Sequence, residues 1–347
     1  MSGFSADAAA LPSRRRGAVT LPRHRQPVVA TALSPSPTQI AISRLRENTS
    51  FKVSCVIFFT IVLMCIAAPL FESGWAGRTA TEQNLSGSVM IGGKKIEAVQ
   101  SDGTPGIAPG FHRQYTFGSD ALGRDVFMRT LRGGRTSLLA GFGAAILGMF
   151  GAIMLGTIAG YKGGWFDTLI TRWVDFMLCF PTLLLMVAMS TALATRSFGP
   201  IHRGSVGLLI IILGTGAIPG MTRMIRALVL GLAEREFVEA ARAMGGTDAR
   251  IMFRHMLPNI SNALVTYFGL MVSGMIIAEA GLSYLGLGIL PPGMSWGSGI
   301  GDGVPYYMTA WWITLIPGGF IVLVATSVNL IGMAIEQAFD PKSLGGR

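Results

Sequence analysis

Charged residues are scarce in this chain. Of its 347 residues, 13% are Asp, Glu, Lys or Arg, whereas soluble domains carry about 25%. Half of the residues are hydrophobic, and the charges are clustered. Several apolar runs therefore reach the length of about 20 residues that a helix needs to cross a bilayer. These runs are too many for a soluble protein with apolar core helices, so we predict a protein that crosses the membrane repeatedly.

Other absences exclude further classes of protein. Cys55, Cys65 and Cys179 lie in apolar stretches without a CxxC pair, so we expect neither a disulfide framework nor a zinc site. No GxxxxGK[ST] motif occurs, since "GGKK" at 92–95 lacks its spacing, and the chain is therefore expected to hold no ATP or Mg²⁺ of its own. The net charge of +10 resides in an N-terminal tail and in loops, which indicates orientation in a membrane rather than nucleic-acid binding.

Six apolar runs define the expected fold, an all-α polytopic membrane protein with six transmembrane helices. The first run begins near Val53 in "VSCVIFFTIVLMCIAAPLF", and an uncleaved first span is favoured over a signal peptide because a long basic tail precedes it. The expected parts are a disordered basic tail (1–50), a first transmembrane helix (51–72), an extracytoplasmic insertion (73–136), a five-helix core (137–335) and a C-terminal tail (336–347). Within the core, the later runs lie at about 137–160, 173–194, 206–231, 260–282 and 312–335.

Basic residues predict that both termini are cytoplasmic. That orientation places 18 of the 28 Lys and Arg residues inside and 10 outside, and 8 of the latter lie in the long first loop, which counts for little. Four of these, Arg124, Arg129, Arg132 and Arg135, nevertheless crowd just before the second span. In the same loop, Val89–Val99 alternates around Gly-Gly and predicts a β-hairpin.

The second span carries a stripe of small residues spaced four apart. Such a stripe lets two helix backbones approach closely in lipid, so we expect this span at the centre of a packed bundle. The stripe consists of Ala140, Ala144, Gly148, Ala152, Gly156 and Gly160.

A polar, basic stretch separates the fourth and fifth spans. Phe237, Ala240, Ala241 and Met244 are spaced as one apolar face of a helix. Gly245 and the glycine after it permit a sharp turn. Thr247 or Asp248 can cap a second helix, and Pro258 falls where the next span begins. We predict two short helices that meet at a bend; the residues alone also permit an ordinary helix lying along the headgroups.

This stretch resembles the "EAA" cytoplasmic loop of bacterial binding-protein-dependent ABC importers. Glu239-Ala240-Ala241, Gly245 and Leu257-Pro258 fall on the motif, while His255 stands at a position where an aliphatic residue is more common. Further segments resemble the C-type permease subunit of the oligopeptide, dipeptide and nickel family. They are "APLF" (68–71), "GSDALGRDVFMRTLRGGRTSLLAG" (118–141), "YKGGWFDTLITRWVDFMLCFPTLLL" (161–185) and "AEAGLSYLGLGILPPGMSWG" (278–297).

The resemblance, which covers roughly residues 51 to 341, implies a permease subunit in the bacterial inner membrane that takes up di- and oligopeptides. It implies as partners a second homologous permease, two cytoplasmic ABC ATPases (or one fused ATPase chain) that bind ATP and Mg²⁺, an extracytoplasmic binding protein, and the membrane lipid around this chain. The chain itself would not be an enzyme. Residues 234–258 would form the loop that couples to an ATPase, with contacts from Phe237, Glu239, Ala240, Ala241, Met244, Gly245, Leu257 and Pro258. Nickel or another small solute is an alternative cargo.

The outer ends of the last two spans hold the candidate gate or pathway residues Glu279, Pro291, Pro292 and Trp296. A carboxylate inside a span costs about 2.5–3.5 kcal/mol at the bilayer centre, so Glu279 is expected either to pair with a base or, as the less favoured alternative, to contact the ligand. The charge-poor segment 286–307 is expected to act as an outer gate or a binding-protein contact, with an ordinary connecting loop as the alternative.

Two functions from other classes compete with this one. "GMSWG" at 293–297 matches G-x-S-x-G, so Ser295 could serve as the nucleophile of an intramembrane serine hydrolase, which would need a strained strand-to-helix turn and a nearby base. A transporter driven by an ion gradient would instead need ionisable residues near mid-membrane, which are scarce in this sequence.

Overall fold

The computed structural model describes residues 37–110, 114–193 and 204–339, which are mostly helical. The helices are α1 (Pro37–Glu47), α2 (Thr49–Ile66), α3 (Ala68–Phe71), α4 (Val126–Lys162), α5 (Gly164–Leu178), α6 (Thr182–Ala192), α7 (Val206–Ala233), α8 (Glu236–Ala243), α9 (Asp248–Arg250), α10 (Leu257–Tyr284), α11 (Trp296–Gly303) and α12 (Trp312–Phe339). Two π-helical turns, η1 (Glu72–Ala76) and η2 (Ile251–Met256), a 3₁₀ turn, η3 (Val304–Tyr306), and the strands β1 (Ser88–Ile91) and β2 (Lys94–Glu97) complete the set.

Five helical segments are long and apolar enough to cross a membrane. They are α2, α4, α7, the continuous segment Asp248–Tyr284 that ends in α10, and α12. A sixth crossing is possible through α5 and α6, which bend by 87° where they meet. The predicted all-α polytopic fold is therefore confirmed, with five or six crossings.

The third apolar run is not the single span predicted over residues 173–194. The helix breaks between Leu178 and Thr182, and Pro181 adopts an extended ψ of 120°. A proline provides no backbone N–H and disfavours helical geometry in the residue before it, so the chain turns there. By contrast, α7 continues through Pro219 and α12 through Pro317.

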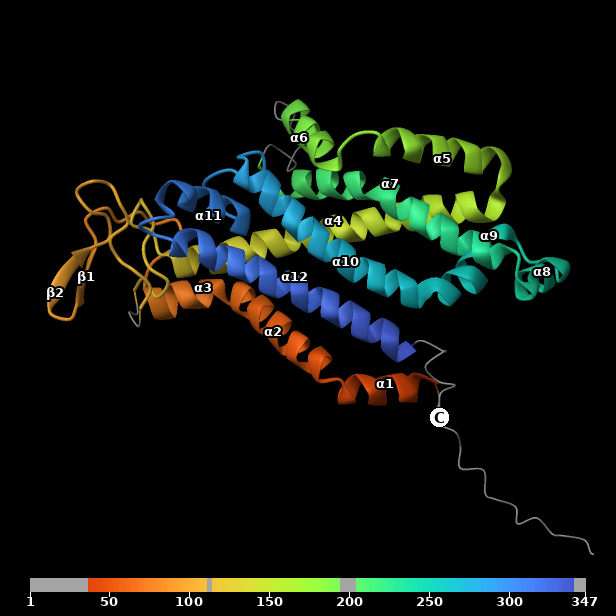
Figure 1. Cartoon of the computed structure of the whole chain (residues 1–347), viewed down its shortest axis with the longest axis horizontal. Helices are drawn as coiled ribbons and strands as arrows, with labels where there is room; N and C mark the ends of the chain where they lie inside the picture. The colour runs from red at the N-terminus through yellow and green to blue at the C-terminus, as the bar shows by residue number, and fades with distance from the viewer. Residues whose placement is uncertain (1–36, 111–113, 194–203, 340–347) are drawn as a thin grey trace, which may run out of the picture. The chain divides into compact units, whose positions relative to one another are not determined.

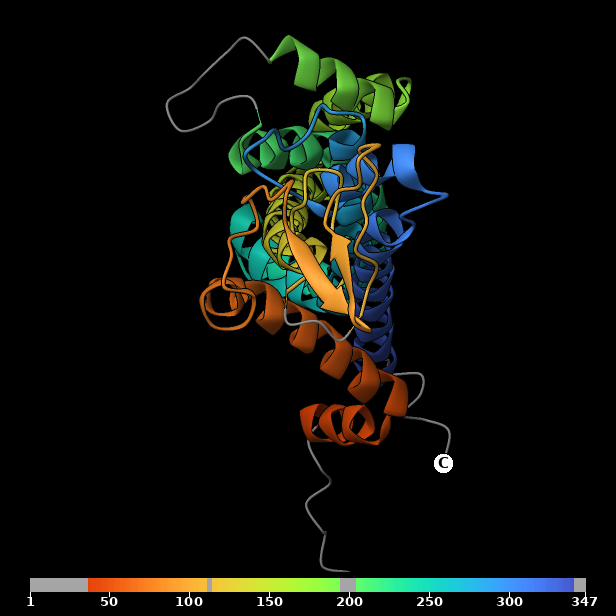
Figure 2. The same ribbon diagram turned by 90° about the vertical axis from the view of Figure 1, so that its left-hand side faces the viewer.

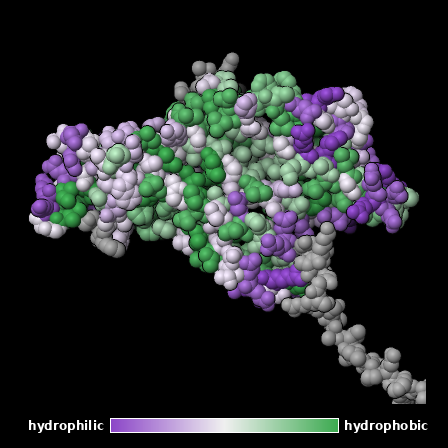
Figure 3. Space-filling model, in the orientation of Figure 1, coloured by the Kyte–Doolittle hydropathy of each residue, from purple (hydrophilic) through white to green (hydrophobic). Residues whose placement is uncertain are grey.

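The chain runs back and forth between two ends of the bundle (Figures 1 and 2). The hairpin β1–β2 lies at one end and α8 at the other, and α4 lies centrally among α7, α10 and α12. Because α4 finishes at the α8 end and α7 starts at the opposite end, the segment between them must return across the bundle. Figure 3 shows polar side chains gathered at both ends and apolar ones over the middle, as expected where lipid surrounds the middle.

The predicted stripe of small residues forms the contact between α4 and α7. All six of its members are buried. At Gly156, an added Cβ would lie 2.9 Å from both the Cβ of Ile225 and the carbonyl oxygen of Thr222. This distance is too short for a side chain, so glycine is what permits the two backbones to approach.

The helix that forms the second span begins before the predicted span itself, and it contains most of the crowded arginines. Asp125 caps α4 by accepting hydrogen bonds from the backbone N–H groups of Phe127 (2.8 Å) and Met128 (3.4 Å). Asp125 is largely buried, and this burial raises the pKa of its carboxyl above the ordinary value. The helix begins at Val126, before the predicted start of the span at residue 137, because this cap and the ion pairs of Arg129 and Arg132 described below stabilise its first turns.

The structure also bears on the predicted hairpin and on the predicted N-terminal tail. The hairpin is confirmed, with Val89 opposite Ile96 and a turn at Gly92 and Gly93, whose φ values are +58° and +80°. The disordered tail was predicted to extend to residue 50; residues 1–36 lie outside the described ranges, but Pro37–Glu47 is helical. This helix packs on α12 and α2, and its Ala41 is buried.

We expect Gly156→Ala to destabilise the bundle by about 1–3 kcal/mol, because the new methyl group overpacks the contact with α7. The measurement is the thermal unfolding midpoint of the purified chain in detergent. Gly274→Ala is the matched control, since nothing lies within 4 Å of a Cβ at Gly274 in α10. Equal midpoints for the two variants would show that the α4–α7 contact does not require close backbone approach.

Candidate coupling surface and the polar cluster near the opposite end

Helix α8 has two apolar sides rather than the single one predicted. Val238 and Ala241 are buried against the rest of the chain. Phe237 is 38% exposed and Met244 81% exposed, and Ala240 lies exposed between them. The prediction grouped Ala241 with the exposed residues and missed Val238, because spacing alone cannot tell which side of a short helix faces its own protein. The exposed stripe is thus Phe237, Ala240 and Met244.

Gly245 forms the predicted bend with defined hydrogen bonds. Its φ is +78°, a left-handed conformation that glycine adopts without steric cost. The N–H of Gly245 donates to the carbonyl of Arg242 (2.9 Å), and that of Gly246 donates to the carbonyl of Ala241 (3.0 Å). This pair of bonds is the Schellman arrangement that ends many helices, so Gly245 fixes the direction in which the chain leaves α8.

Tyr161, near the end of α4, joins both arms of the bent segment. Its ring lies 4.8 Å from the guanidinium carbon of Arg242 in α8, and its hydroxyl accepts a hydrogen bond from Nε of Arg242 (3.3 Å). The same hydroxyl donates to the Oδ1 atom of Asp248 in α9 (3.3 Å). Sequence reasoning missed this residue, although an aromatic residue directly after the last glycine of the small-residue stripe was a usable signal.

The second arm runs directly into α10. Thr247 caps α9 by accepting from the N–H of Arg250 (3.4 Å), as one of the two predicted caps. The N–H of Leu257 donates to the carbonyl of Met252, one residue further back than in an α-helix. This π-helical turn accommodates Pro258, which cannot donate a backbone hydrogen bond. Leu257 and Pro258 therefore lie in a continuous helix rather than at the start of a separate one.

The remaining motif residues lie on the outside or at the junction. Glu239 is exposed and forms no ion pair with the described residues. His255 is half-buried in η2, where its carbonyl accepts from the Nδ2 atom of Asn259 (2.6 Å). Neither Glu239 nor His255 forms a described hydrogen bond with the exposed stripe. The structure thus places Phe237, Glu239, Ala240 and Met244 facing outward, Ala241 facing inward and Gly245 at the bend.

Glu279 of α10 is completely buried in a cluster of hydroxyl groups. Its Oε1 atom accepts a hydrogen bond from Ser283 (2.6 Å). Ser137 of α4 and Ser295 also interact with this carboxyl, while its Oε2 atom has no partner in hydrogen-bond geometry. The predicted pairing with a base of a neighbouring helix does not occur among the described residues. Serines from three segments surround the carboxyl instead.

Trp296, one of the candidate gate or pathway residues, is buried and contacts α4. Its indole Nε1 donates to the carbonyl of Thr130 (2.9 Å), and its backbone N–H donates to Ser137 (3.1 Å). A Cβ at Gly134 of α4 would come within 2.6 Å of the indole ring, so glycine there makes room for it. Pro291 and Pro292, by contrast, are exposed. The loop therefore has a buried base and an exposed tip.

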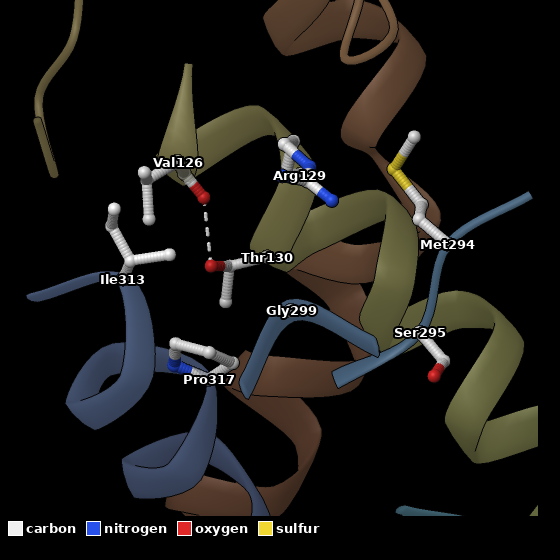
Figure 4. A pocket seen from close by; sticks show the side chains of 8 residues that line it. All are labelled: Val126, Arg129, Thr130, Met294, Ser295, Gly299, Ile313 and Pro317. Carbon is white, nitrogen blue, oxygen red and sulfur yellow. Dashed lines mark hydrogen bonds between the residues drawn. The ribbon is translucent and has the colours of Figure 1, made fainter. Parts of the chain in front are cut away.

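Figure 4 shows how closely α4, α11 and α12 meet at this base. Thr130, Gly299 and Pro317 contribute to the walls of a cavity of about 10 Å³, which is the space of a single water molecule. The side chains of Met294 and Ser295 point to opposite sides as the chain enters α11 (Figure 4). This cavity is too small to hold a peptide.

Ser295 is a helix cap, not a catalytic nucleophile. Its Oγ atom accepts a hydrogen bond from the backbone N–H of Ser298 (3.2 Å), and the Oγ atom of Ser298 accepts one from the backbone N–H of Ser295 (2.9 Å). The residue is buried and follows a loop, so the strand-to-helix turn of G-x-S-x-G enzymes is not formed. Among the described residues, no three His, Cys, Asp or Glu side chains gather as metal ligands would.

Two parts of this chain match known protein families. Residues 152–344 match the family model described as binding-protein-dependent transport system inner membrane component. Residues 36–84 match the N-terminal transmembrane domain of oligopeptide transport permease C.

Three named relatives align over most of this chain. A peptide transport system permease protein of Brucella abortus is 35% identical over 310 residues, which cover 88% of this chain and 93% of the relative. The dipeptide permease DppC of Alkalihalophilus pseudofirmus is 33% identical, with 88% and 90% covered. The oligopeptide permease OppC of Bacillus subtilis is 32% identical, with 87% and 88% covered.

We expect Glu279→Gln to retain the stability of the wild-type chain, because an amide can keep the bond from Ser283. Glu279→Ala should lower the free energy of unfolding by about 1–3 kcal/mol, since it leaves buried hydroxyls without a partner. Thermal unfolding in detergent, followed by tryptophan fluorescence, measures both. If Glu279→Gln were as unstable as Glu279→Ala, the cluster would depend on charge rather than on hydrogen bonding.

Proposed function

Because the chain belongs to the family of binding-protein-dependent transport system inner membrane components, we propose that it is the permease subunit of a peptide importer driven by partner ATPases. The proposed importer contains a second, homologous permease chain, two ATPase subunits or one fused ATPase chain, and an extracytoplasmic binding protein. The ATPases bind ATP and Mg²⁺, and this chain contributes the moving passage. Both termini and α8 lie on the cytoplasmic side in this proposal.

The observation that carries the proposal is the exposed stripe on α8. An exposed apolar stripe outside the span usually marks a contact with another protein, and here it lies at a polar end of the bundle (Figure 3). Arg235, Glu236 and Glu239 surround it with charges, as in protein interfaces with an apolar centre and a polar rim. An ATPase surface with an apolar cleft fits this arrangement.

The contacts of Tyr161 support a mechanical role for the same segment. A displacement of α8 or α9 reaches α4 through Arg242, Asp248 and Tyr161. It then reaches α7 through the close contact at Gly148 and Gly156. Alternating access needs only that the ATPases and the binding protein prefer different arrangements of these helices.

The cargo is proposed from the relatives. All three are named for peptide, dipeptide or oligopeptide transport, and they align with nearly the whole of the described bundle. Nickel or another small solute is the second candidate on the sequence resemblance alone. Transport by an ion gradient has weaker support, because the buried carboxyl of Glu279 is enclosed by serines and forms no ion pair with the described residues.

The tip of the outer loop is the proposed gate or binding-protein contact. Pro291 and Pro292 line a cavity of about 680 Å³ together with Tyr284 and Asp302. Deleting residues 291–297 would test this role, but it would also remove the buried contacts of Ser295 and Trp296 with α4. Replacing only the exposed Pro291 and Pro292 therefore tests gating without disturbing the folding of the loop.

We expect a cysteine at Met244 to cross-link to the ATPase in membranes from cells that express the whole importer. The experiment requires a variant in which Cys55, Cys65 and Cys179 are replaced. Met90→Cys, exposed on β1 at the other end of the bundle, is the control and should not cross-link. Labelling of Met244→Cys by a membrane-impermeant thiol reagent added from outside would overturn the proposed orientation and function.

We expect Tyr161→Phe to weaken coupling, because it removes the hydroxyl contacts with Arg242 and Asp248 but keeps the ring. Peptide uptake per ATP hydrolysed should fall roughly fivefold, the effect of about one hydrogen bond, in proteoliposomes that hold the complete importer. Tyr267→Phe, at a half-buried position of α10 for which the structure describes no side-chain hydrogen bond, should leave the ratio unchanged. An unaltered ratio in Tyr161→Phe would exclude this route of transmission.

A further inference from the structure

The four arginines near the start of α4 do not share one role. Nε of Arg124 lies 2.7 Å from Asp120, and Arg129 forms ion pairs with Asp120 and Asp302. Arg132 binds Glu72 through two parallel bonds, from Nε (2.9 Å) and from an Nη atom (2.7 Å). Three of the four charges are therefore neutralised within the chain.

Arg135 differs from the other three. It is exposed, lies within a membrane-crossing helix, and forms no ion pair with any described residue. A cation in a span is costly unless its head reaches a polar or anionic partner. The cavities that Arg135 lines therefore indicate which kind of partner its guanidinium binds.

Two cavities meet at Arg135. One, of about 470 Å³, has a mixed wall that includes the charged side chains of Arg132 and Glu72 and the hydroxyls of Thr79, Thr81 and Thr136. The other is an apolar groove of about 820 Å³ between α2, α4 and α7, with Phe58, Val62, Phe142, Ile146 and Ile210. Arg135 and Leu139 line both. The pair of cavities thus joins a basic, hydroxyl-lined chamber to an apolar channel.

We propose that these adjoining cavities form a binding site for one anionic glycerophospholipid, with its phosphate on Arg135 and an acyl chain in the groove. The charges fit: Arg132 and Glu72 cancel, which leaves Arg135 as one net positive charge for one phosphodiester. Thr79 and Thr81 hydrogen-bond to each other (3.4 Å), which leaves one of their two hydroxyls as a donor for the headgroup, while Thr136 donates to the carbonyl of Arg132 (3.4 Å). An arginine guanidinium matches phosphate oxygens with paired donors.

The dimensions also fit one leaflet. From Arg135 to Ile146 the helix rises by about 16 Å, and one leaflet contributes roughly 15 Å of the hydrocarbon core. The groove therefore extends from the headgroup position about as far as an acyl chain reaches in its own leaflet. The lipid belongs to the leaflet on the hairpin side of the bundle, because Arg135 lies in the part of α4 nearest to that end (Figure 1).

Native mass spectrometry of the purified full-length chain, titrated with phosphatidylglycerol or phosphatidylcholine, tests the proposal. We expect one tightly retained phosphatidylglycerol per chain and on the order of tenfold weaker retention in Arg135→Gln, since a charge-assisted bond is lost. Arg254→Gln, an exposed arginine in η2 at the other end of the bundle, should bind like the wild type. Equal retention of the two lipids, or no effect of Arg135→Gln, would overturn the proposal.

A photoreactive residue at Leu139, which is 56% exposed and lines both cavities, identifies the occupant in cells that express the whole importer. Cross-linking to phospholipid supports the site. Cross-linking to the second permease chain would instead show that a protein helix fills the groove and would refute the lipid assignment. This second measurement holds even if Arg135→Gln does not fold.

Discussion

The close contact between α4 and α7 is the constraint on which the rest of this structure depends. In lipid, two helices gain little from hiding apolar surface, so they associate through close packing of their backbones. Gly148, Gly156 and Gly160 supply that approach, and an added Cβ at each would meet α7 within about 3 Å. The pair therefore forms a stiff unit that spans the bundle, and features at both ends are built on α4.

At the hairpin end, α4 holds the outer loop in place. Gly133 and Gly134 let Ser295 and Trp296 lie directly against the helix, and Ser137 and Thr130 accept hydrogen bonds from Trp296. At the α8 end, Tyr161 contacts both arms of the bent segment. One helix thus connects the proposed ATPase contact with the base of the proposed gate. Such a connection can transmit movement without any residue in the middle changing its partners.

The sequence predicted the parts that depend on local pattern. Five of the six spans, the hairpin at Gly92-Gly93, the stripe of small residues and the turn at Gly245 all follow from periodicity or from glycine geometry, and the structure contains each, whereas the third span breaks at Pro181. The parts that it did not predict depend on contacts between distant residues. Val238 faces inward because of the chain behind α8. Helix α4 continues through Arg129 and Arg132 because Asp120, Asp302 and Glu72 lie beside them, and Glu279 interacts with Ser137 and Ser295 of other segments as well as with Ser283. Of these partners, Asp120 and Ser283 are near in sequence to the residue that needs them, and the others are distant.

The arginines also bear on the orientation of the chain. Counted as free charges on the outer side, they oppose the usual bias toward basic residues in the cytoplasm. With Glu72 and Asp120 beside them, Arg132 and Arg129 are parts of ion pairs. Arg132 keeps the pKa of the Glu72 carboxyl below its usual value, because the hydrogen bonds between them favour the charged form. These pairs carry little net charge, so the crowding of arginines near the second span is compatible with a cytoplasmic N-terminus. Only Arg135 lacks a partner among the described residues, and that is the position at which the two cavities meet.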